Sequence, residues 1–316
     1  MDAIAGLAFG TDVNTLESDE DIIQRHLDKI FPKLFTRMVM PLPYWRWFKL
    51  PSDKALDRAL VEVNRAIDGF IAAARDRLTD PARRAAPQNL LEAMLVAADA
   101  PDSGITGDQV SGNVMTMLLA GEDTTANTLA WAIWLLHRHP EALARAQTEA
   151  RDVMAEGGPV TLDHLARLDY IEACMHETMR LRPVAPLIGL QALKDTVAGD
   201  VAVPAGTIVM ALMRHDSIDD SHVPGAAQFK PERWLGEGGL APAAAKRVSM
   251  PFGAGPRMCP GRYLALQEMA MVMVTLLTHF DIVAVGTEDG GEPVERLMFA
   301  MAPVGLRMTV RARAAR

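Results

Sequence analysis

One stretch carries most of what this sequence reveals: Pro251-Phe252-Gly253-Ala254-Gly255-Pro256-Arg257-Met258-Cys259-Pro260-Gly261. Its cysteine lies in a turn rich in glycine and proline, and an apolar pattern with the period of a helix follows from Tyr263 to Phe280. At the start of a helix, unpaired N–H groups and the helix dipole favour a thiolate over a thiol. The stretch therefore predicts that Cys259 offers a sulfur ligand to a metal. The alternative is a buried structural cysteine in a tight turn.

The residues around the cysteine suit a flat partner that carries carboxylates. Gly253 and Gly255 allow backbone conformations that a side chain would forbid, so the loop can lie against a planar group. Arg257 offers a forked guanidinium to a carboxylate such as a haem propionate. Phe252 is placed to shield the sulfur from water.

The stretch resembles the haem-binding loop of the cytochrome P450 family, whose pattern it carries as Phe252-Gly253-x-Gly255-x-Arg257-x-Cys259-x-Gly261. The resemblance implies haem b (iron protoporphyrin IX) as the cofactor and Cys259 as the ligand of its iron. It also implies that the other fixed residues of the pattern, Gly261 included, contact the haem. In this family the thiolate pushes electron density onto the iron and favours O–O cleavage.

A second motif, Ala120-Gly121-Glu122-Asp123-Thr124-Thr125, lies inside a helical pattern from Thr106 to His139. Gly121 costs about 1 kcal/mol relative to alanine, and threonine hydroxyls can bond backbone carbonyls, so we expect the helix to widen there. Read alone, these polar residues are typical of a solvated helix face. The resemblance implies that the helix makes room for dioxygen beside Ala120 and Gly121. It also implies that Asp123 and Thr124 relay protons to the distal oxygen.

A third group of residues predicts a scaffold rather than a reacting centre. In Glu177-Thr178-Met179-Arg180 a carboxylate and a guanidinium lie three residues apart, where they can pair on one helix face. By itself this spacing is typical of a surface ion pair. Pro231-Glu232-Arg233-Trp234 supplies a second arginine in a loop. The resemblance implies that Glu177, Arg180 and Arg233 form a buried network that holds the cysteine loop.

The rest of the sequence predicts a mainly α protein with small β-sheets. Helical periods occur near Glu20–Met38, Asp53–Leu78, Asn89–Ala98, Pro140–Met154, Leu168–Leu181 and Arg262–Phe280. Short strands are expected at Val201–Val203, Thr207–Met213 and Leu306–Val310. The resemblance implies a cytochrome P450-like fold, and we expect one domain over residues 1–316.

Composition excludes several other classes of protein. The 316 residues are 49% hydrophobic and carry a net charge of −8, which predicts a large core and no binding of nucleic acid. The two cysteines, Cys174 and Cys259, lie far apart, so we expect a reducing compartment and a buried, inert Cys174. No histidine pair has the spacing of a zinc hydrolase. With no long apolar run or signal-like start, we predict a cytoplasmic protein without a transmembrane anchor.

The sequence also predicts the partners of the reaction. No Gly-rich phosphate loop follows a strand, so we expect no fused flavin or nicotinamide module and an external electron donor. Four cations near the cysteine, Lys246, Arg247, Arg257 and Arg262, predict an acidic carrier such as a ferredoxin or flavodoxin with its reductase. Scattered surface cations are the alternative. The remaining partners implied are O2 and a small apolar substrate.

Two features depart from the family pattern. Family members usually carry roughly one hundred further residues before the position of Met1, so we expect an N-terminally truncated fold with an exposed apolar face. Leu190-Gln191 stand where many members have another propionate-binding arginine.

Three functions follow from these observations. The leading one is a haem-thiolate monooxygenase that inserts one atom of O2 into an apolar organic substrate. The others are a haem-thiolate isomerase or dehydratase, and a truncated, catalytically inactive remnant.

Overall fold

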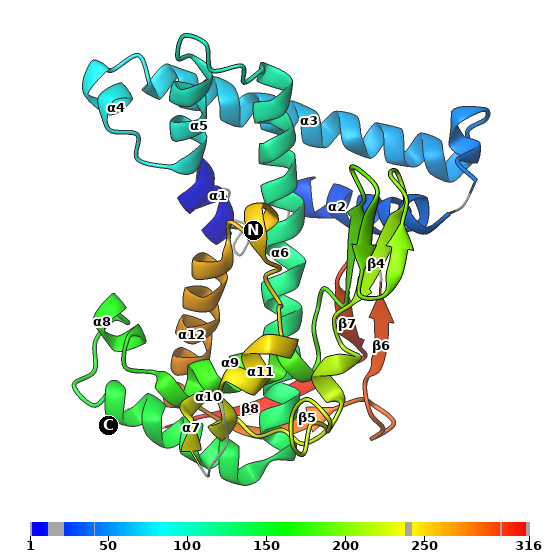
Figure 1. Ribbon diagram of the computed structural model, residues 1–316. Helices are drawn as coiled ribbons and strands as arrows, with labels where there is room; N and C mark the ends of the chain where they lie inside the picture. Colours follow the sequence, from blue (N-terminus) through cyan, green and yellow to red (C-terminus); the bar gives the residue numbers. More distant parts are fainter. Residues whose placement is uncertain (1, 12–21, 41, 238–241, 298, 314–316) are drawn as a thin grey trace. The chain divides into compact units, whose positions relative to one another are not determined.

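The computed structural model describes residues 2–11, 22–40, 42–237, 242–297 and 299–313 (Figure 1). The chain divides into two compact units, Met1–Asp123 and Thr124–Arg316. Each unit has its own helices and its own buried side chains. One domain over residues 1–316 stays a prediction.

The described part of unit 1 is helical. Its helices are α1 (Asp2–Phe9), α2 (Ile22–Val39), α3 (Pro51–Arg77), α4 (Pro81–Ala85), α5 (Leu90–Ala98) and the first half of α6 (Gly107–Arg138). The helices expected from the apolar period are confirmed as α2, α3 and α5, while Glu20 lies outside the described residues. The short α4 was not predicted.

Helix α3 shows why these segments fold as they do. Pro51 occupies its first turn, where no N–H donor is needed, and Asp53 accepts a hydrogen bond from the Leu50 N–H at 3.0 Å. Its buried residues recur every three or four positions: Leu56, Ala59, Val63, Ile67, Phe70 and Ala74. This apolar face lets α3 pack against α2 and α5.

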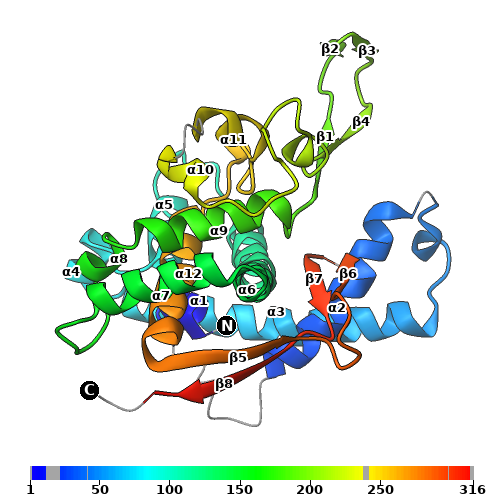
Figure 2. The same ribbon diagram turned by 90° about the horizontal axis from the view of Figure 1, so that it is seen from below.

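Unit 2 is built around three helices that pack together. Its helices are the second half of α6, α7 (Pro140–Val153), α8 (Leu162–Leu165), α9 (Asp169–Leu181), α10 (Glu232–Leu235), α11 (Pro242–Val248) and α12 (Arg262–His279). Helix α12 contacts both α7 and α9, and Figure 2 shows the three side by side. Fully buried residues such as Trp131, Leu136, Met273 and Leu277 fill the core between them. The expected helices at 140–154, 168–181 and 262–280 are confirmed.

The described strands, all in unit 2, pair into four two-stranded antiparallel sheets. The pairs are β1 (Leu187–Gln191) with β4 (Ile208–Leu212), β2 (Thr196–Ala198) with β3 (Val201–Val203), β5 (Phe280–Gly286) with β8 (Arg307–Ala312), and β6 (Val294–Leu297) with β7 (Met301–Val304). The expected strands are confirmed as β3, β4 and β8. Strands β1, β2, β5, β6 and β7 were missed, and the helix expected to reach Phe280 ends at His279 because Phe280 turns into β5.

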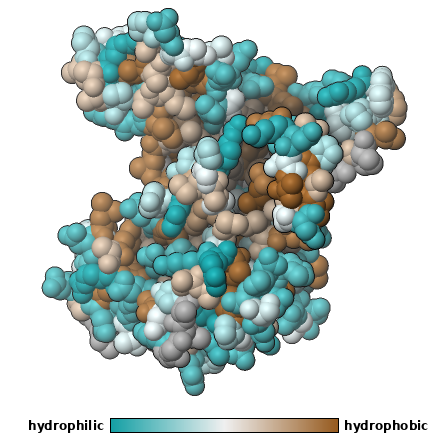
Figure 3. Space-filling view, in the orientation of Figure 1, coloured by the Kyte–Doolittle hydropathy of each residue, from teal (hydrophilic) through white to brown (hydrophobic). Residues whose placement is uncertain are grey.

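The sheet of β1 and β4 exposes apolar side chains. Ile208, Met210 and Leu212 alternate along β4 and are 70%, 49% and 62% exposed. Figure 3 shows hydrophobic side chains at the surface around this hairpin. A two-stranded sheet is marginal in isolation, so the packing of α7, α9 and α12 supplies most of the core of unit 2.

Candidate functional site

The cysteine loop is a closed backbone structure between α11 and α12. The Cys259 N–H donates to the Phe252 carbonyl at 2.8 Å, and the Met258 N–H donates to the Gly255 carbonyl at 3.1 Å. Gly253 and Gly255 both have a φ of 69°, in the left-handed region that favours glycine. The loop therefore needs both glycines to close in this form.

Cys259 is the accessible thiol of the molecule. It is half-buried and lies directly before α12, whereas Cys174 is fully buried, and burial raises the pKa of that thiol well above its usual range. A Cβ on Gly261 would lie 3.8 Å from the Cys259 Sγ, so the sulfur sits against a glycine. Of the two cysteines, Cys259 therefore has the position and exposure of a metal ligand.

The donor set fits haem better than a bare metal ion. Within the described ranges no three residues among His, Cys, Asp and Glu come together as a metal site. A bare zinc ion needs about four protein ligands, whereas haem brings four nitrogens of its own and takes one axial thiolate. One cysteine on a glycine loop suits the second case.

The neighbours of the cysteine have different environments. Phe252 is partly buried and packs against the core of unit 2. Arg257 is exposed at the end of a short 3-10 turn, η4 (Gly255–Arg257). Lys246 and Arg247 are also exposed on α11. The pairing of Arg257 with a propionate stays a prediction.

Glu177 is the centre of a buried network. Its carboxylate accepts hydrogen bonds from Arg180 Nε at 2.8 Å and Nη2 at 2.7 Å, one turn further along α9. Arg233 Nε of α10 donates to the same carboxylate at 3.0 Å, and the Lys230 N–H donates at 2.9 Å. All three predicted scaffold residues are therefore in contact. The Glu177–Arg180 pair, whose spacing is also typical of a surface ion pair, is fully buried.

The two arginines also hold the loop between β4 and α10. Their remaining N–H groups donate to the carbonyls of Ser217, Pro224, Gly225, Ala226 and Gln228. One carboxylate thus fixes two cations, which in turn order the loop. Buried charges paired in this way are costly to separate, by about 3 to 5 kcal/mol.

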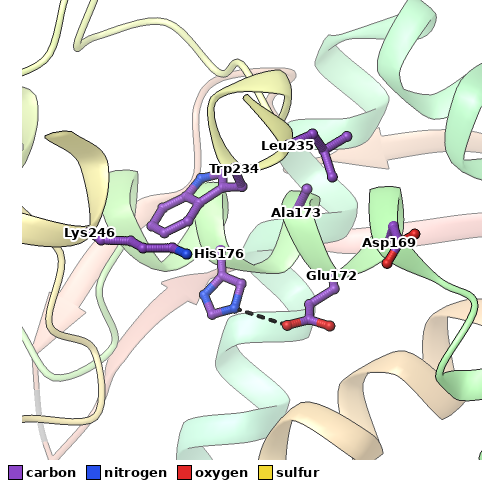
Figure 4. A pocket seen from close by; sticks show the side chains of 7 residues that line it. All are labelled: Asp169, Glu172, Ala173, His176, Trp234, Leu235 and Lys246. Carbon is purple, nitrogen blue, oxygen red and sulfur yellow. Dashed lines mark hydrogen bonds and ion pairs between the residues drawn. The ribbon is translucent and has the colours of Figure 1, made fainter. Parts of the chain in front are cut away.

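Trp234 is a further member of the network that the sequence did not reveal. Its Nε1–H donates to Glu177 Oε2 at 3.0 Å, and its ring stacks on His176 with centroids 4.9 Å apart. A surface pocket of about 180 Å³ surrounds this pair, lined also by Glu172 and Lys246 (Figure 4). A hydrogen bond with His176 lowers the pKa of Glu172. The Trp234 indole contacts both the His176 ring of α9 and the buried Glu177 carboxylate.

Helix α6 carries the predicted acid and alcohol. Asp123 and Thr124 are consecutive residues where unit 1 ends and unit 2 begins. The structure is α-helical at every position of Gly107–Arg138, and the widening expected beside Gly121 stays a prediction. Thr128 Oγ1 donates to the Thr124 carbonyl at 2.8 Å, a bond that an unbroken helix accommodates.

Gly121 has a packing role within unit 1. A Cβ at this position would lie 1.9 Å from Ile4 Cδ1, so the glycine allows α1 to approach α6 closely. Ala120 is half-buried on the same helix. The roles of Ala120, Gly121, Asp123 and Thr124 beside dioxygen stay predictions.

Comparison with known proteins identifies the relatives of this chain. The family described as "Cytochrome P450" matches residues 1–310. The chain is 31% identical to "25-hydroxyvitamin D-1 alpha hydroxylase, mitochondrial" of Homo sapiens, over 93% of this chain and 58% of that protein. It is 30% identical to "Cyclooctat-9-en-7-ol 5-monooxygenase" of Streptomyces melanosporofaciens, over 89% of this chain and 59% of that protein. The chain thus spans about three fifths of the length of these relatives.

A solved structure shows the same fold. The crystal structure of the cytochrome P450DA heme domain superposes with a TM-score of 0.80 at 24% sequence identity, covering 99% of this chain and 66% of that one. The prediction of a mainly α fold of this type is therefore confirmed. No helix of the described ranges is long and apolar enough to cross a membrane.

Proposed function

This chain belongs to the cytochrome P450 family, and from that premise we propose that it acts as a haem-thiolate monooxygenase. The reaction inserts one atom of O2 into an apolar organic substrate, while external electrons and protons reduce the other atom to water. The observation that supports this most directly is Cys259, a half-buried thiol on a glycine loop closed by its own N–H.

The residues of the cysteine loop would hold haem b, the cofactor of this family. Cys259 would provide a thiolate ligand, and Gly253, Gly255 and Gly261 would keep the adjoining backbone free of side chains. Phe252 limits water near the sulfur, and Arg257 offers a guanidinium to a carboxylate of the cofactor. When bound, haem would supply the activation of O2, which a thiolate ligand favours.

The residues of α6 would handle protons. The Asp123 carboxylate can take a proton from solvent, and the neighbouring Thr124 hydroxyl can both accept and donate one. The network of Glu177, Arg180 and Arg233 has no part in these steps. Its role is to keep the loop before α10 in place.

An external protein would deliver the electrons. Lys246, Arg247 and Arg257 are exposed cations near the cysteine in the sequence, in a chain whose net charge is −8. Such a local excess of positive charge attracts an acidic carrier, a ferredoxin or flavodoxin with its reductase. A cytoplasmic location stays a prediction, since one relative is named as mitochondrial.

The carbon monoxide difference spectrum tests this function. The chain is produced with haem available, reduced and exposed to carbon monoxide, and we expect the red-shifted Soret band of a thiolate-ligated haem. Cys259→Ala removes that band, whereas Cys174→Ala, which removes the buried thiol, keeps it. A thiolate-type band in Cys259→Ala would refute the ligand assignment. Absence of the band from the unsubstituted chain would favour the inactive alternative.

A second measurement separates the monooxygenase from a haem-thiolate enzyme that uses no O2. Thr124→Ala is expected to keep the thiolate band and to consume more O2 for each product formed. Product formation without any O2 consumption would favour the isomerase or dehydratase.

A further inference from the structure

Arg262 lies beside the cysteine loop without belonging to the motif that defines it. It is the first residue of α12, and its backbone N–H donates to the Cys259 carbonyl at 3.4 Å. Its guanidinium carbon lies 5.9 Å from the ring centroid of Phe252 and 5.7 Å from that of Tyr263. The cation therefore contacts two aromatic rings at the distances of cation–π interactions.

The charge of Arg262 is not explained by an ion pair. Among the residues that the structure describes, no carboxylate lies within 4.0 Å of its guanidinium, and its Nε is buried without a hydrogen-bond partner. Arg180 and Arg233, by contrast, both donate to Glu177. Arg182 and Arg214 also have a buried Nε without a partner, but their guanidinium groups bind Glu295, whereas that of Arg262 lies against two aromatic rings.

Two of the contacts of Arg262 lead back to the cysteine. Phe252, whose ring lies against the guanidinium, is the residue whose carbonyl accepts the Cys259 N–H at 2.8 Å. The backbone N–H of Arg262 donates to the Cys259 carbonyl, which fixes the position of the Arg262 backbone. Cys259, Phe252 and Arg262 thus form a closed set of contacts that fixes a positive charge beside the thiol-bearing loop.

The same charge acts on the neighbouring helix. The pKa of Glu172 on α9 is lowered first by its hydrogen bond with His176, and also by the charges of Arg262 and Lys246. Lys246 is exposed, so water and salt screen its field. Arg262 is half-buried, so its field is screened less than that of an exposed cation.

We propose that Arg262 is a positioning residue of the cysteine loop whose fixed positive charge favours the reduced state of the bound haem-thiolate centre. Reduction of the iron adds one negative charge, and a nearby cation stabilises the more negative state. Charge placed close to a cofactor is one of the means by which a protein sets its potential. This inference rests on the proposed function, because it requires haem on Cys259.

The midpoint reduction potential of the haem-loaded chain tests the proposal. Arg262→Gln removes the charge and keeps a polar side chain, and we expect a more negative potential at both low and high salt. Arg262→Lys keeps the charge and should stay close to the unsubstituted chain. Arg247→Gln is the matched control, an exposed cation on α11 whose effect should vanish when salt is raised.

The outcomes separate this inference from the function beneath it. A thiolate-type carbon monoxide band together with an unshifted potential in Arg262→Gln overturns the inference alone. An equal shift in Arg262→Lys also overturns it, since packing rather than charge would then be responsible. Arg262→Met, which keeps the apolar stem, replaces Arg262→Gln if that variant loses haem. Absence of the thiolate band from the unsubstituted chain overturns both proposals.

Discussion

Two buried carboxylates, Glu92 in unit 1 and Glu177 in unit 2, are both paired with arginines, but the arginines differ in their exposure to solvent. Both are fully buried, and each accepts hydrogen bonds from two arginines. The arginines of Glu92 are Arg77 and Arg83, whose side chains remain 25% exposed. The arginines of Glu177 are Arg180 and Arg233, whose side chains are at most 2% exposed. Water can therefore screen the charges of the Glu92 cluster but not those of the Glu177 cluster.

The two clusters also join different parts of the chain. The partners of Glu92 lie 15 and 9 residues away, and the cluster ties α3, α4 and α5 together. Glu177 reaches Arg180 within one turn but Arg233 only 56 residues later. Its arginines go on to bind loop carbonyls, whereas Arg77 binds one carbonyl, that of Phe9. The same chemistry thus stabilises a helix packing in one unit and a long loop in the other.

Substitution of Glu177 should have the largest effect on stability. Glu177→Gln leaves two fully buried cations without a counter-charge and points an amide donor at their N–H groups, which should cost about 3 to 5 kcal/mol. Urea unfolding followed by circular dichroism measures the change in the free energy of unfolding.

The matched control is Glu172→Gln, which lies on the same helix with its side chain 59% exposed. We expect a change below about 0.5 kcal/mol. If Glu177→Gln proved as stable as this control, the network would contribute nothing to folding.

Glu92 should show a smaller effect that depends on pH. Burial alone would raise its pKa, but the N–H groups of Arg83 and Arg77 outweigh burial and lower the pKa from 4.5 to about 2. A lowered carboxyl pKa contributes stability that is full above about pH 4.5 and is lost as the pH falls toward 2. The stability difference between the unsubstituted chain and Glu92→Gln should therefore shrink over this window.

Unfolding free energies measured from pH 7 down to the lowest pH at which the chain stays folded check this expectation. Glu62→Gln, at a partly exposed acid of α3 that pairs with the exposed Arg65, should show no such narrowing. A difference for Glu92→Gln that stayed constant with pH would mean that its pKa is not lowered.

Loss of the hydrogen bond from Trp234 to Glu177 should lower the free energy of unfolding by an intermediate amount. Trp234→Phe keeps an aromatic ring near His176 but removes the Nε1–H that donates to Glu177. One lost hydrogen bond to a charged group should cost about 1.5 kcal/mol. Trp47→Phe, at a ring that is 72% exposed, is the control and should leave the urea midpoint unchanged. Equal midpoints for both variants would show that the indole bond is dispensable.

The sequence predicted those parts of the fold and the site that depend on local spacing. The apolar period marks α3, α7, α9 and α12, and the three-residue spacing of Glu177 and Arg180 predicts that they can pair. Gly253 and Gly255 were identified because a loop with positive φ needs glycine.

Features that depend on packing between distant segments were not predictable. Glu92 and its arginines follow no motif, and Arg262 was grouped with exposed cations because nothing in its sequence shows the two rings against it. Strand β5 continues directly from α12, so its residues read as the end of a helix.

The smallest expected effect concerns the helix that carries Glu92. Asn89 caps α5, since its Oδ1 accepts the Glu92 N–H at 2.9 Å, whereas α9 is capped by Glu149 of α7, which accepts the N–H groups of Tyr170 and Ile171. A cap within the same segment is replaceable by any short side chain with an acceptor, so Asn89→Ala should cost about 1 kcal/mol and Asn89→Ser should restore most of it. Urea unfolding of the two variants side by side measures this. Equal stability of the alanine variant and the unsubstituted chain would show that the Asn89 oxygen does not stabilise α5.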